Sequence, residues 1–241
     1  MSRKRGFYEK YIKRLFDIIC SLLAIICFSW LYIIVAVLVR IKLGSPILFK
    51  QPRPGLIDSK TGKEKIFYMY KFRTMTDKKD ENGNLLPDEV RLTPFGKKLR
   101  ATSLDELPEA FNILKGDMSI IGPRPQLVRD MVFMSEEQRM RHTAKPGLSG
   151  LAQVMGRNAI SWEEKFKWDL EYIKKISFIN DIKIIFLTAK KVFGHEESSA
   201  ELDVTDDYGD ALLKANKITD DEYNKLQDYS EKILKECIRG R

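Results

Sequence analysis

Residues Ile18–Val39 read IICSLLAIICFSWLYIIVAVLV, which is 22 consecutive residues without a charged side chain. As an α-helix this run would be about 33 Å long, enough for a hydrocarbon core of about 30 Å. A cleaved signal peptide is not expected, because the apolar run is too long for one and no small-residue cleavage site follows it. The sequence therefore predicts a membrane segment close to the N-terminus.

Basic residues flank the apolar run on both sides: Arg3, Lys4, Arg5, Lys10, Lys13 and Arg14 before it, and Arg40, Lys42, Lys50 and Arg53 after it. The positive-inside rule places both flanks on the cytoplasmic side. A helix that enters the membrane, breaks near Ser29–Trp30 and returns would satisfy this, since each arm of about 11 residues reaches roughly 16 Å. A single-pass anchor is the alternative, because no proline is present to force a break.

The overall composition describes a mostly globular chain. Of its 241 residues, 44% are hydrophobic and 32% are charged, which excludes a polytopic membrane protein and a disordered chain. Lys and Arg number 42 against 34 Asp and Glu, a net charge of +8, so an anionic partner is expected: nucleic acid, a phosphorylated small molecule or anionic lipid. The three cysteines form no disulfide framework and favour a reducing, cytosol-facing location.

A β-hairpin is predicted directly after the membrane segment. Residues 47–49 form one strand and residues 66–73, IFYMYKFR, form the other, because the side chains there alternate with a period of two. The intervening PRPGLIDSKTGKEK, residues 52–65, is rich in Pro, Gly and Lys and is typical of a loop. In the second strand Lys71 and Arg73 share one face.

Two amphipathic helices are predicted in the second half of the chain. Ser161 and Glu164 form a capping box. The apolar stripe that follows at helical spacing is Trp162, Phe166, Leu170, Ile173 and Ile176. A second helix begins at Asn180 or Asp181 and ends at Gly194, and its lysines suit either an anionic membrane surface or an ordinary packing helix.

The C-terminal segment differs in charge from the rest. Residues 200–241 hold 11 acidic and 7 basic side chains, a net charge of −4, so residues 1–199 carry +12. A capping box at Thr219 and Glu222, with a short helix around 211–215, predicts a helical hairpin that could serve self-association. The fold class is therefore α+β and helix-rich, in three parts: a basic N-terminus and membrane helix (1–42), a cytoplasmic domain (43–195) and an acidic helical extension (196–241).

Residues 100–125, RATSLDELPEAFNILKGDMSIIGPRP, hold the densest group of residues suited to chemistry. Pro108 is tolerated in the first turn of a helix, which places Asp105 at or near the N-cap and Glu106 in the first turn. The free N–H groups there favour an ionised carboxylate, as a nucleophile requires. Adjacent carboxylates can divide two tasks, one attacking and the other holding a divalent metal ion. Acidic residues at a helix start are also ordinary caps.

Cations surround this carboxylate pair in the sequence pattern. Arg124 stands between Pro123 and Pro125, so its guanidinium is presented from a stiff backbone, which suits phosphate. Arg100 lies five residues before Asp105, and Lys71 and Arg73 lie on the predicted strand. Each alone could be a surface cation. Together, downstream of a membrane segment, they indicate phosphoryl transfer at a membrane surface.

Six segments then carry a family resemblance. They are KRLFDI (13–18), Q-x-R-P-G (51–55), YKFRTM (70–75), SLDELPEAFNILKGDMSIIGPRP (103–125), KPGLSGLAQVMGRNAISWEEK (145–165) and WDLEYIKKISFINDIKII (168–185). In order and over about residues 10–195, they resemble the bacterial sugar transferases, the small single-domain type of monotopic phosphoglycosyl transferase. The acidic tail lies outside the resemblance.

The resemblance implies transfer of a sugar 1-phosphate from a UDP-sugar to a polyprenol (undecaprenyl) phosphate, with release of UMP and with Mg²⁺. Asp105 would form an aspartyl-phosphosugar, Asp105 and Glu106 would bind Mg²⁺, and Glu106 could instead assist as a base. The residues implied to bind phosphate or substrate are Arg124, Arg100, Lys71, Arg73, Arg157, Asn158, Pro123 and Pro125. The family's membrane helix is re-entrant and broken at a Ser-Pro pair, where this chain has Ser29–Trp30.

The resemblance also implies a location and partners: the bacterial inner membrane with the catalytic domain on its cytoplasmic face, membrane lipids, and no nucleic acid. The transfer would be the first membrane step in the assembly of a surface glycan. An alternative function is a single-pass, membrane-anchored basic scaffold, which would bind polyanions and would not need Asp105. Paired carboxylates beside a proline-flanked arginine favour the enzyme.

Overall fold

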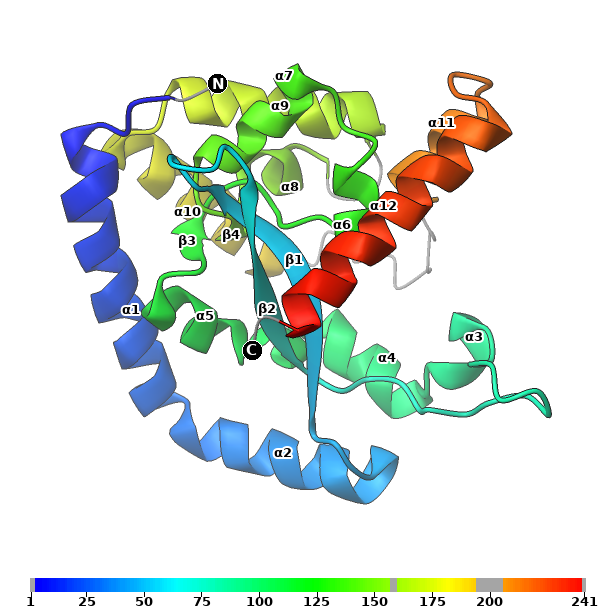
Figure 1. Cartoon of the computed structure of the whole chain (residues 1–241). Helices are drawn as coiled ribbons and strands as arrows, with labels where there is room; N and C mark the ends of the chain where they lie inside the picture. The colour runs from blue at the N-terminus through cyan, green and yellow to red at the C-terminus, as the bar shows by residue number, and fades with distance from the viewer. Residues whose placement is uncertain (1–2, 157–159, 194–205, 240–241) are drawn as a thin grey trace.

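The computed structural model describes residues 3–156, 160–193 and 206–239. The chain begins with a π-helical turn, η1 (Tyr8–Ile12), which runs into α1 (Lys13–Cys27). After Phe28 the chain turns into α2 (Ser29–Leu43), and the two arms are bent by 64°. In Figure 1 they form a bracket along one side and the bottom of the molecule. Among the described residues no single helix is long and apolar enough to cross a membrane, whereas the two helices of this bent pair are long and apolar enough when taken together.

The break lies at Phe28, immediately before the predicted Ser29–Trp30. Phe28 leaves helical geometry, with φ −100° and ψ 11°, and Ser29 is the first residue of α2. The backbone is bridged across the break, because Phe28 N–H donates to the Ala24 carbonyl and the Phe28 carbonyl accepts from Tyr32 N–H. The bend therefore forms without a proline.

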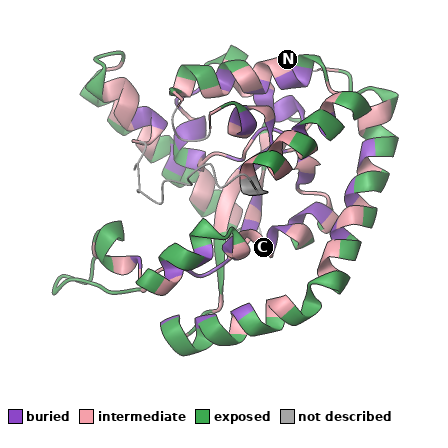
Figure 2. Ribbon diagram, turned by 180° about the vertical axis from the view of Figure 1, so that it is seen from behind, coloured by how far each residue is buried: buried purple, intermediate pink, exposed green. Residues whose placement is uncertain are grey.

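Helix α1 has its polar residues turned inward and its apolar residues turned outward. Its buried residues are Lys13, Asp17 and Ser21, spaced four apart on one face. Its exposed residues include Leu15, Phe16, Ile19, Leu22, Leu23 and Ile26. Figure 2 shows exposed residues along the outer side of both α1 and α2. An apolar outer face on a helix with a polar inner face is the arrangement expected in lipid, not in water.

The predicted β-hairpin is present and longer than expected. Strand β1 (Leu48–Ile57) pairs antiparallel with β2 (Glu64–Phe72), with an irregularity between Pro54 and Ile57. The prediction of a loop from residue 52 was wrong, because β1 continues through Pro52 and Pro54. The sheet has two strands, so each strand has one edge without a hydrogen-bonded neighbour. Pro52 and Pro54 are two residues apart, so the positions at which they lack an N–H can both face this open edge, where no donor is needed.

Short elements connect the hairpin to the rest of the domain. They are α3 (Asp88–Arg91), α4 (Pro94–Ala101), η2 (Leu104–Glu106), α5 (Glu109–Lys115), β3 (Ser119–Ile121), α6 (Val128–Met131), α7 (Glu136–Arg139), η3 (Met140–Thr143), β4 (Gly147–Ser149) and α8 (Leu151–Met155). Strands β3 and β4 pair in parallel. Helix α1 packs on α5, so the membrane segment contacts the part of the chain that follows the Asp105–Glu106 turn.

The two predicted helices of the second half are α9 (Trp162–Lys174) and α10 (Phe178–Phe193). The capping box of Ser161 with Glu164 is confirmed. Helix α10 begins at Phe178, two or three residues earlier than the predicted Asn180 or Asp181, and Asp181 N–H donates to the Ser177 carbonyl. Its exposed apolar side chains are Phe178, Ile179, Ile182 and Phe186. The predicted stop at Gly194 lies outside the described residues.

The acidic tail forms the predicted helical hairpin, α11 (Tyr208–Lys214) and α12 (Asp220–Arg239). It packs against the body of the protein: Tyr208 is buried in one cluster with Phe133, Met134 and Phe166. The Tyr208 N–H also donates to Asp130 Oδ1 over 2.9 Å. Figure 1 shows α12, in red, crossing in front of the β1–β2 hairpin, and it contacts α6. The helix-rich α+β prediction is confirmed.

Candidate active site

The Asp105–Glu106 pair lies in a 3₁₀ turn, η2, rather than at the N-cap of the following helix. Ser103 reverses the chain in the left-handed region with φ 53°, and the turn closes by a 3.1 Å hydrogen bond from Glu106 N–H to the Ser103 carbonyl. Pro108 itself is the N-cap of α5, with φ −64°. The predicted N-cap position of Asp105 was therefore wrong, because the proline ends one turn and begins the next.

Glu106 lies between two cations. Its Oε1 accepts hydrogen bonds from Lys71 Nζ at 2.6 Å and from Arg124 Nη2 at 3.0 Å. Burial opposes ionisation of Glu106, but Arg124 and Lys71 outweigh it and lower the pKa of this carboxyl to about 2. The structure thus brings together three of the residues named from the sequence, from β2, η2 and the segment after β3.

Glu109 is a second buried carboxyl beside the same lysine. Its Oε1 lies 3.3 Å from Lys71 Nζ, its side chain is 3% exposed, and this oxygen has no hydrogen-bond partner among the described residues. Burial raises the pKa of Glu109 to about 7, with the charge of Glu106 acting in the same direction. Sequence reasoning missed Glu109. Its spacing of three from Glu106 was the available signal, since such residues share a side of a helical turn.

Asp105 is buried and forms no ion pair with any described residue. Burial raises the pKa of Asp105, and the neighbouring charge of Glu106 adds to this, while Lys71 and Arg100 lower it. The expectation of a carboxylate held ionised by a helix N-terminus was therefore wrong. The ionised state of Asp105 depends on nearby cations instead.

The backbone that carries Arg124 is held from three directions. The Pro123 carbonyl accepts from Gly147 N–H at 3.0 Å, the Arg124 carbonyl accepts from Arg141 Nη2 at 2.7 Å, and the Pro125 carbonyl accepts from Arg53 Nη1 at 3.1 Å. The backbone at Arg124 is therefore held by these three carbonyl contacts as well as by the flanking Pro123 and Pro125, in keeping with the stiffness predicted for it.

Arg53 and Arg141, which bind that backbone, were not identified from the sequence. Arg141 is 1% exposed and pairs with Asp169 through two hydrogen bonds of 2.9 and 2.6 Å. Burial and the nearby guanidinium of Arg124 lower the pKa of Arg53 to about 10. The only available signal was the Q-x-R-P-G segment, which contains Arg53.

The other predicted residues lie apart from this cluster. Arg100, on α4, is exposed and donates from Nε to Thr74 Oγ1 at 3.0 Å, although its charge still acts on Asp105. Arg73 is buried and donates to the carbonyls of Leu43 and Ser45, after the end of α2. It lies one residue beyond β2, so the strand alternation that paired it with Lys71 no longer applies. Arg157 and Asn158 lie outside the described residues.

Within the described part of the chain, no three carboxylate, histidine or cysteine side chains are grouped to hold a metal ion. The residues do fit the manner in which Mg²⁺ is commonly bound, through one or two carboxylates together with substrate phosphates and water. Asp105 and Glu106 supply two such carboxylates on adjacent residues. They would depend on a phosphorylated substrate to complete the coordination.

The bent pair α1–α2 contacts this site directly. The Tyr32 hydroxyl on α2 donates to the carbonyl of Leu107, the residue after Glu106, over 2.6 Å. Arg14 on α1 donates to the carbonyls of Ile113 and Leu114 at the end of α5, over 2.6 and 2.8 Å. Both ends of the segment from η2 to α5 are thereby attached to helices whose outer faces are apolar.

Comparison with known proteins shows which family the chain resembles. The profile of the family described as bacterial sugar transferase matches residues 8–195. The chain is 50% identical over 185 residues to the uncharacterized sugar transferase EpsL of Bacillus subtilis (strain 168), covering 77% of this chain and 89% of that protein.

Longer relatives carry names that state a reaction. The UDP-glucose:undecaprenyl-phosphate glucose-1-phosphate transferase of Escherichia coli (strain K12) is 37% identical over 197 residues, 77% of this chain and 41% of that protein. The UDP-N-acetylgalactosamine-undecaprenyl-phosphate N-acetylgalactosaminephosphotransferase of Aeromonas hydrophila is 36% identical over 193 residues, 76% of this chain and 44% of that protein. The chain thus spans less than half the length of these two relatives. This chain belongs to the bacterial sugar transferase family.

Proposed function

We propose that this chain transfers a sugar 1-phosphate from a UDP-sugar to undecaprenyl phosphate and releases UMP. The observation that supports this most is the cluster in which Lys71 and Arg124 converge on Glu106, beside the buried Asp105. Two cations next to a candidate nucleophile suit a diphosphate, whose charge they would offset. The reactions named for the longer relatives point to the same substrates.

In the proposed first step an Asp105 carboxylate oxygen attacks the β-phosphorus of the UDP-sugar. A P–O bond forms to Asp105, the bond from the β-phosphorus to the oxygen bridging it to the α-phosphorus breaks, and UMP leaves with that electron pair. In the second step an oxygen of the lipid phosphate attacks the same phosphorus and Asp105 leaves as a carboxylate. Neither step requires a proton to be removed from a hydroxyl, in keeping with a site built of cations and carboxylates.

The chain's own residues have separate tasks in this scheme. Arg124, fixed by its backbone contacts, and Lys71 would hold the diphosphate, and Arg100 would help to keep Asp105 ionised. Asp105 and Glu106 are the residues that would hold Mg²⁺, which when bound would neutralise phosphate charge. Glu106, ionised at neutral pH, keeps both cations next to Asp105 in the absence of substrate.

The bent pair α1–α2 would place this site at the membrane. Its exposed apolar outer face supports insertion, and the basic residues on both flanks support a re-entrant path with both ends on the cytoplasmic side of the bacterial inner membrane. An acceptor lipid leaves the bilayer only at a cost of about 0.8 kcal/mol for each exposed CH₂. The enzyme must therefore bring the soluble UDP-sugar to the lipid.

The test is UMP release by the purified full chain in detergent, with a panel of UDP-sugars and undecaprenyl phosphate. Asp105→Asn should abolish release, while Asp228→Asn, at an exposed position on α12, should leave it unchanged. Mass spectrometry of the wild-type chain incubated without lipid should find a phosphosugar on Asp105. Full turnover by the Asn variant would exclude the covalent mechanism.

Topology has a separate test. Lys4 and Lys60 are both exposed, one before α1 and one at the turn of the β1–β2 hairpin. In sealed inverted vesicles both should react with a membrane-impermeant amine reagent, because both lie on the cytoplasmic side. Labelling of only Lys60 would establish a straight span instead.

A further inference from the structure

A second group of cations surrounds a small cavity at the start of α1. The cavity has a volume of about 50 Å³ and lies between the first turns of η1 and α1 and the body of the protein. Its charged lining residues are Arg5, Lys10, Lys13, Arg14, Lys145, Glu9 and Asp17. None of these residues belongs to the Asp105 cluster, so the cavity is a distinct feature of the molecule.

Several of the lining charges already have partners. Lys13 pairs with Asp181 over 2.6 Å, and Glu9 pairs with Arg3 over 2.6 Å. Arg14 is occupied by the two carbonyls at the end of α5. Asp17 accepts from Ser119 Oγ at 2.9 Å and from the backbone N–H of Ile120 at 3.0 Å.

Three of the cations that line the cavity have no such partner. The side chains of Arg5, Lys10 and Lys145 form no hydrogen bond or ion pair with any residue that the structure describes. Lys10 makes a ring contact, with its ammonium 5.2 Å from the centre of the Tyr11 ring. The cavity therefore has an excess of positive charge that the protein itself leaves uncompensated.

The head groups of Arg14 and Lys145 approach each other closely. A Cβ placed on Gly116 would lie 3.2 Å from Arg14 Nη2 and 3.3 Å from Lys145 Nζ, so both groups approach the same backbone position. Burial lowers the pKa of Lys145, and the charges of Arg14 and Arg5 add to this effect, while the carboxylates of Asp17 and Asp117 act against it. Like charges brought together in a half-buried site disfavour each other unless an anion joins them.

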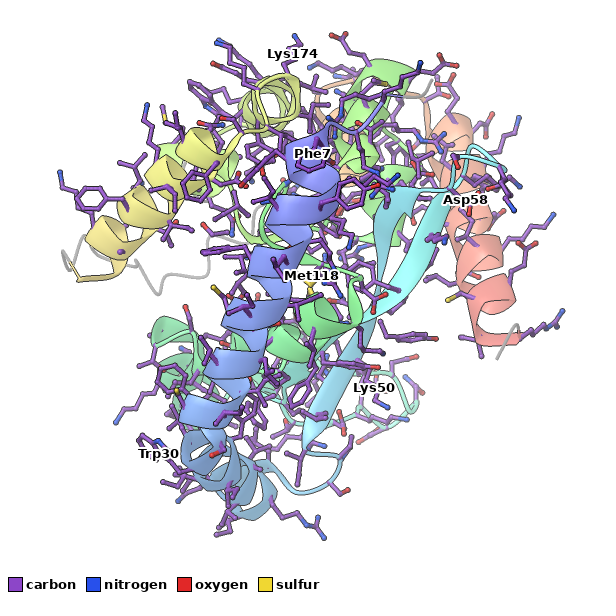
Figure 3. All side chains as sticks on the ribbon, turned by 90° about the vertical axis from the view of Figure 1, so that its left-hand side faces the viewer. Phe7, Trp30, Lys50, Asp58, Met118 and Lys174 are labelled. Atoms are coloured by element: carbon purple, nitrogen blue, oxygen red, sulfur yellow. The ribbon has the colours of Figure 1, made fainter. Side chains whose placement is uncertain are left out.

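The surroundings indicate what kind of anion this is. Phe7 is 72% exposed and Tyr11 is 53% exposed, and their rings lie 5.2 Å apart on the outer side of the same helix. Figure 3 shows Phe7 at the end of the N-terminal helix that lies far from the bend, and Trp30 beyond the bend, near the start of α2. Exposed aromatic side chains at the end of an apolar helix are typical of the level of lipid head groups. The cavity is lined by Lys10, the neighbour of Tyr11 in the chain, so it lies close to the level at which head-group phosphates would lie.

The size of the cavity favours a small anionic group over a whole nucleotide. Pockets for small-molecule ligands have volumes of about 300–1,000 Å³, whereas this cavity has a volume of about 50 Å³. We propose that Arg5, Lys10 and Lys145 bind the phosphate of an anionic phospholipid. Basic pockets beside membrane helices bind anionic head groups in this way.

The experiment measures stabilisation of the full chain in a non-ionic detergent by short-chain lipids. Dihexanoyl-phosphatidylglycerol should raise the midpoint of thermal unfolding in a saturable manner, and dihexanoyl-phosphatidylcholine should not. Lys145→Gln should weaken the apparent affinity for phosphatidylglycerol about tenfold, which is the loss of one charge-assisted contact. The matched control is Lys60→Gln, at the exposed hairpin turn, which should retain the wild-type affinity.

A second variant guards against a folding defect in the first. Arg5→Gln lies at an exposed position before η1, and it should weaken binding in the same direction. Equal stabilisation of both variants and the wild type would overturn the proposal. So would an equal midpoint shift with inorganic phosphate at the same concentration, because the site would then select free phosphate. UMP release without added phospholipid should be unchanged in both variants. A failure of the phospholipid-binding proposal can therefore be distinguished from a failure of the proposed reaction.

Discussion

Replacement of Lys71 by methionine tests the cation cluster directly. The substitution keeps an unbranched side chain of similar length and removes only the ammonium that joins Glu106 and Glu109. Glu106 would retain Arg124, whereas Glu109 would lose the cation nearest to it. Because burial already raises the pKa of Glu109, this residue would take up a proton at neutral pH instead of remaining charged. The fold should therefore survive the change.

The size of the effect follows from the geometry. The Lys71 side chain is 16% exposed and its ammonium lies 2.6 Å from Glu106 Oε1, so the contact is short and largely shielded from water. Hydrogen bonds to charged groups contribute about 1.5–3 kcal/mol, which corresponds to about 10- to 150-fold in a rate or binding constant. Since Arg124 remains, we expect a loss of about 10- to 30-fold in kcat/KM for UMP release.

The pH profile gives a sharper signal than the rate alone. Asp105 must be ionised to attack, so activity is lost as pH falls through the pKa of Asp105. Lys71 lowers that pKa more than any other neighbour does, so its removal raises the pKa further and moves the acidic limb of the profile to higher pH.

The assay is kcat/KM for UMP release measured between pH 5 and pH 9 in the wild type, Lys71→Met and the control Lys65→Met. Lys65 lies on the same strand with its side chain 71% exposed, so its variant should retain both the rate and the profile. A Lys71→Met enzyme with a tenfold lower rate but an unmoved acidic limb would refute the electrostatic role assigned to Lys71.

Three further substitutions test other contacts. Lys13→Met should lower the free energy of unfolding in detergent by about 3 kcal/mol, measured by chemical denaturation, because it leaves the buried Asp181 without its cation. Protonated Glu109 stabilises the folded wild type below pH 4.5, and this stabilisation is lost as pH rises to the raised pKa of about 7. Glu109→Gln has no such loss, so the unfolding free energy of the variant relative to the wild type should increase by about 3 kcal/mol from pH 4.5 to pH 7. Tyr32→Phe should lower the unfolding free energy by about 1 kcal/mol in the same assay through loss of its hydrogen bond to Leu107.

The sequence was most informative where the signal is local. The capping box at Ser161 and Glu164 and the apolar stripe of α9 depend on neighbours within one helix, and both are present. The apolar run 18–39 likewise predicted helix from its own composition, and the chain there forms the bent pair α1–α2. Its break came within one residue of the predicted pair, although the bend occurs at Phe28 without a proline.

Predictions failed where the outcome depends on what a segment packs against. Nothing in the letters PRPG indicates that β1 has an open edge that tolerates Pro52 and Pro54. The pKa of Asp105 could not be anticipated either, because a raised or lowered value depends on burial and on Lys71 from a distant strand. Arg141 was overlooked for the same reason, since its role lies in a contact with the Arg124 carbonyl across the fold.

The polar face of α1 explains why the membrane arm and the site cannot move independently. Lys13, Arg14 and Asp17 bind α10, the end of α5 and the start of β3, respectively, while the opposite face of the same helix is apolar and exposed. Withdrawal of α1 from the body would leave these charges buried in lipid or unpaired, at a cost of several kcal/mol each. Because Tyr32 on α2 donates to the carbonyl of Leu107, next to the turn that carries Asp105, a displacement of the bent pair would displace Asp105 with it.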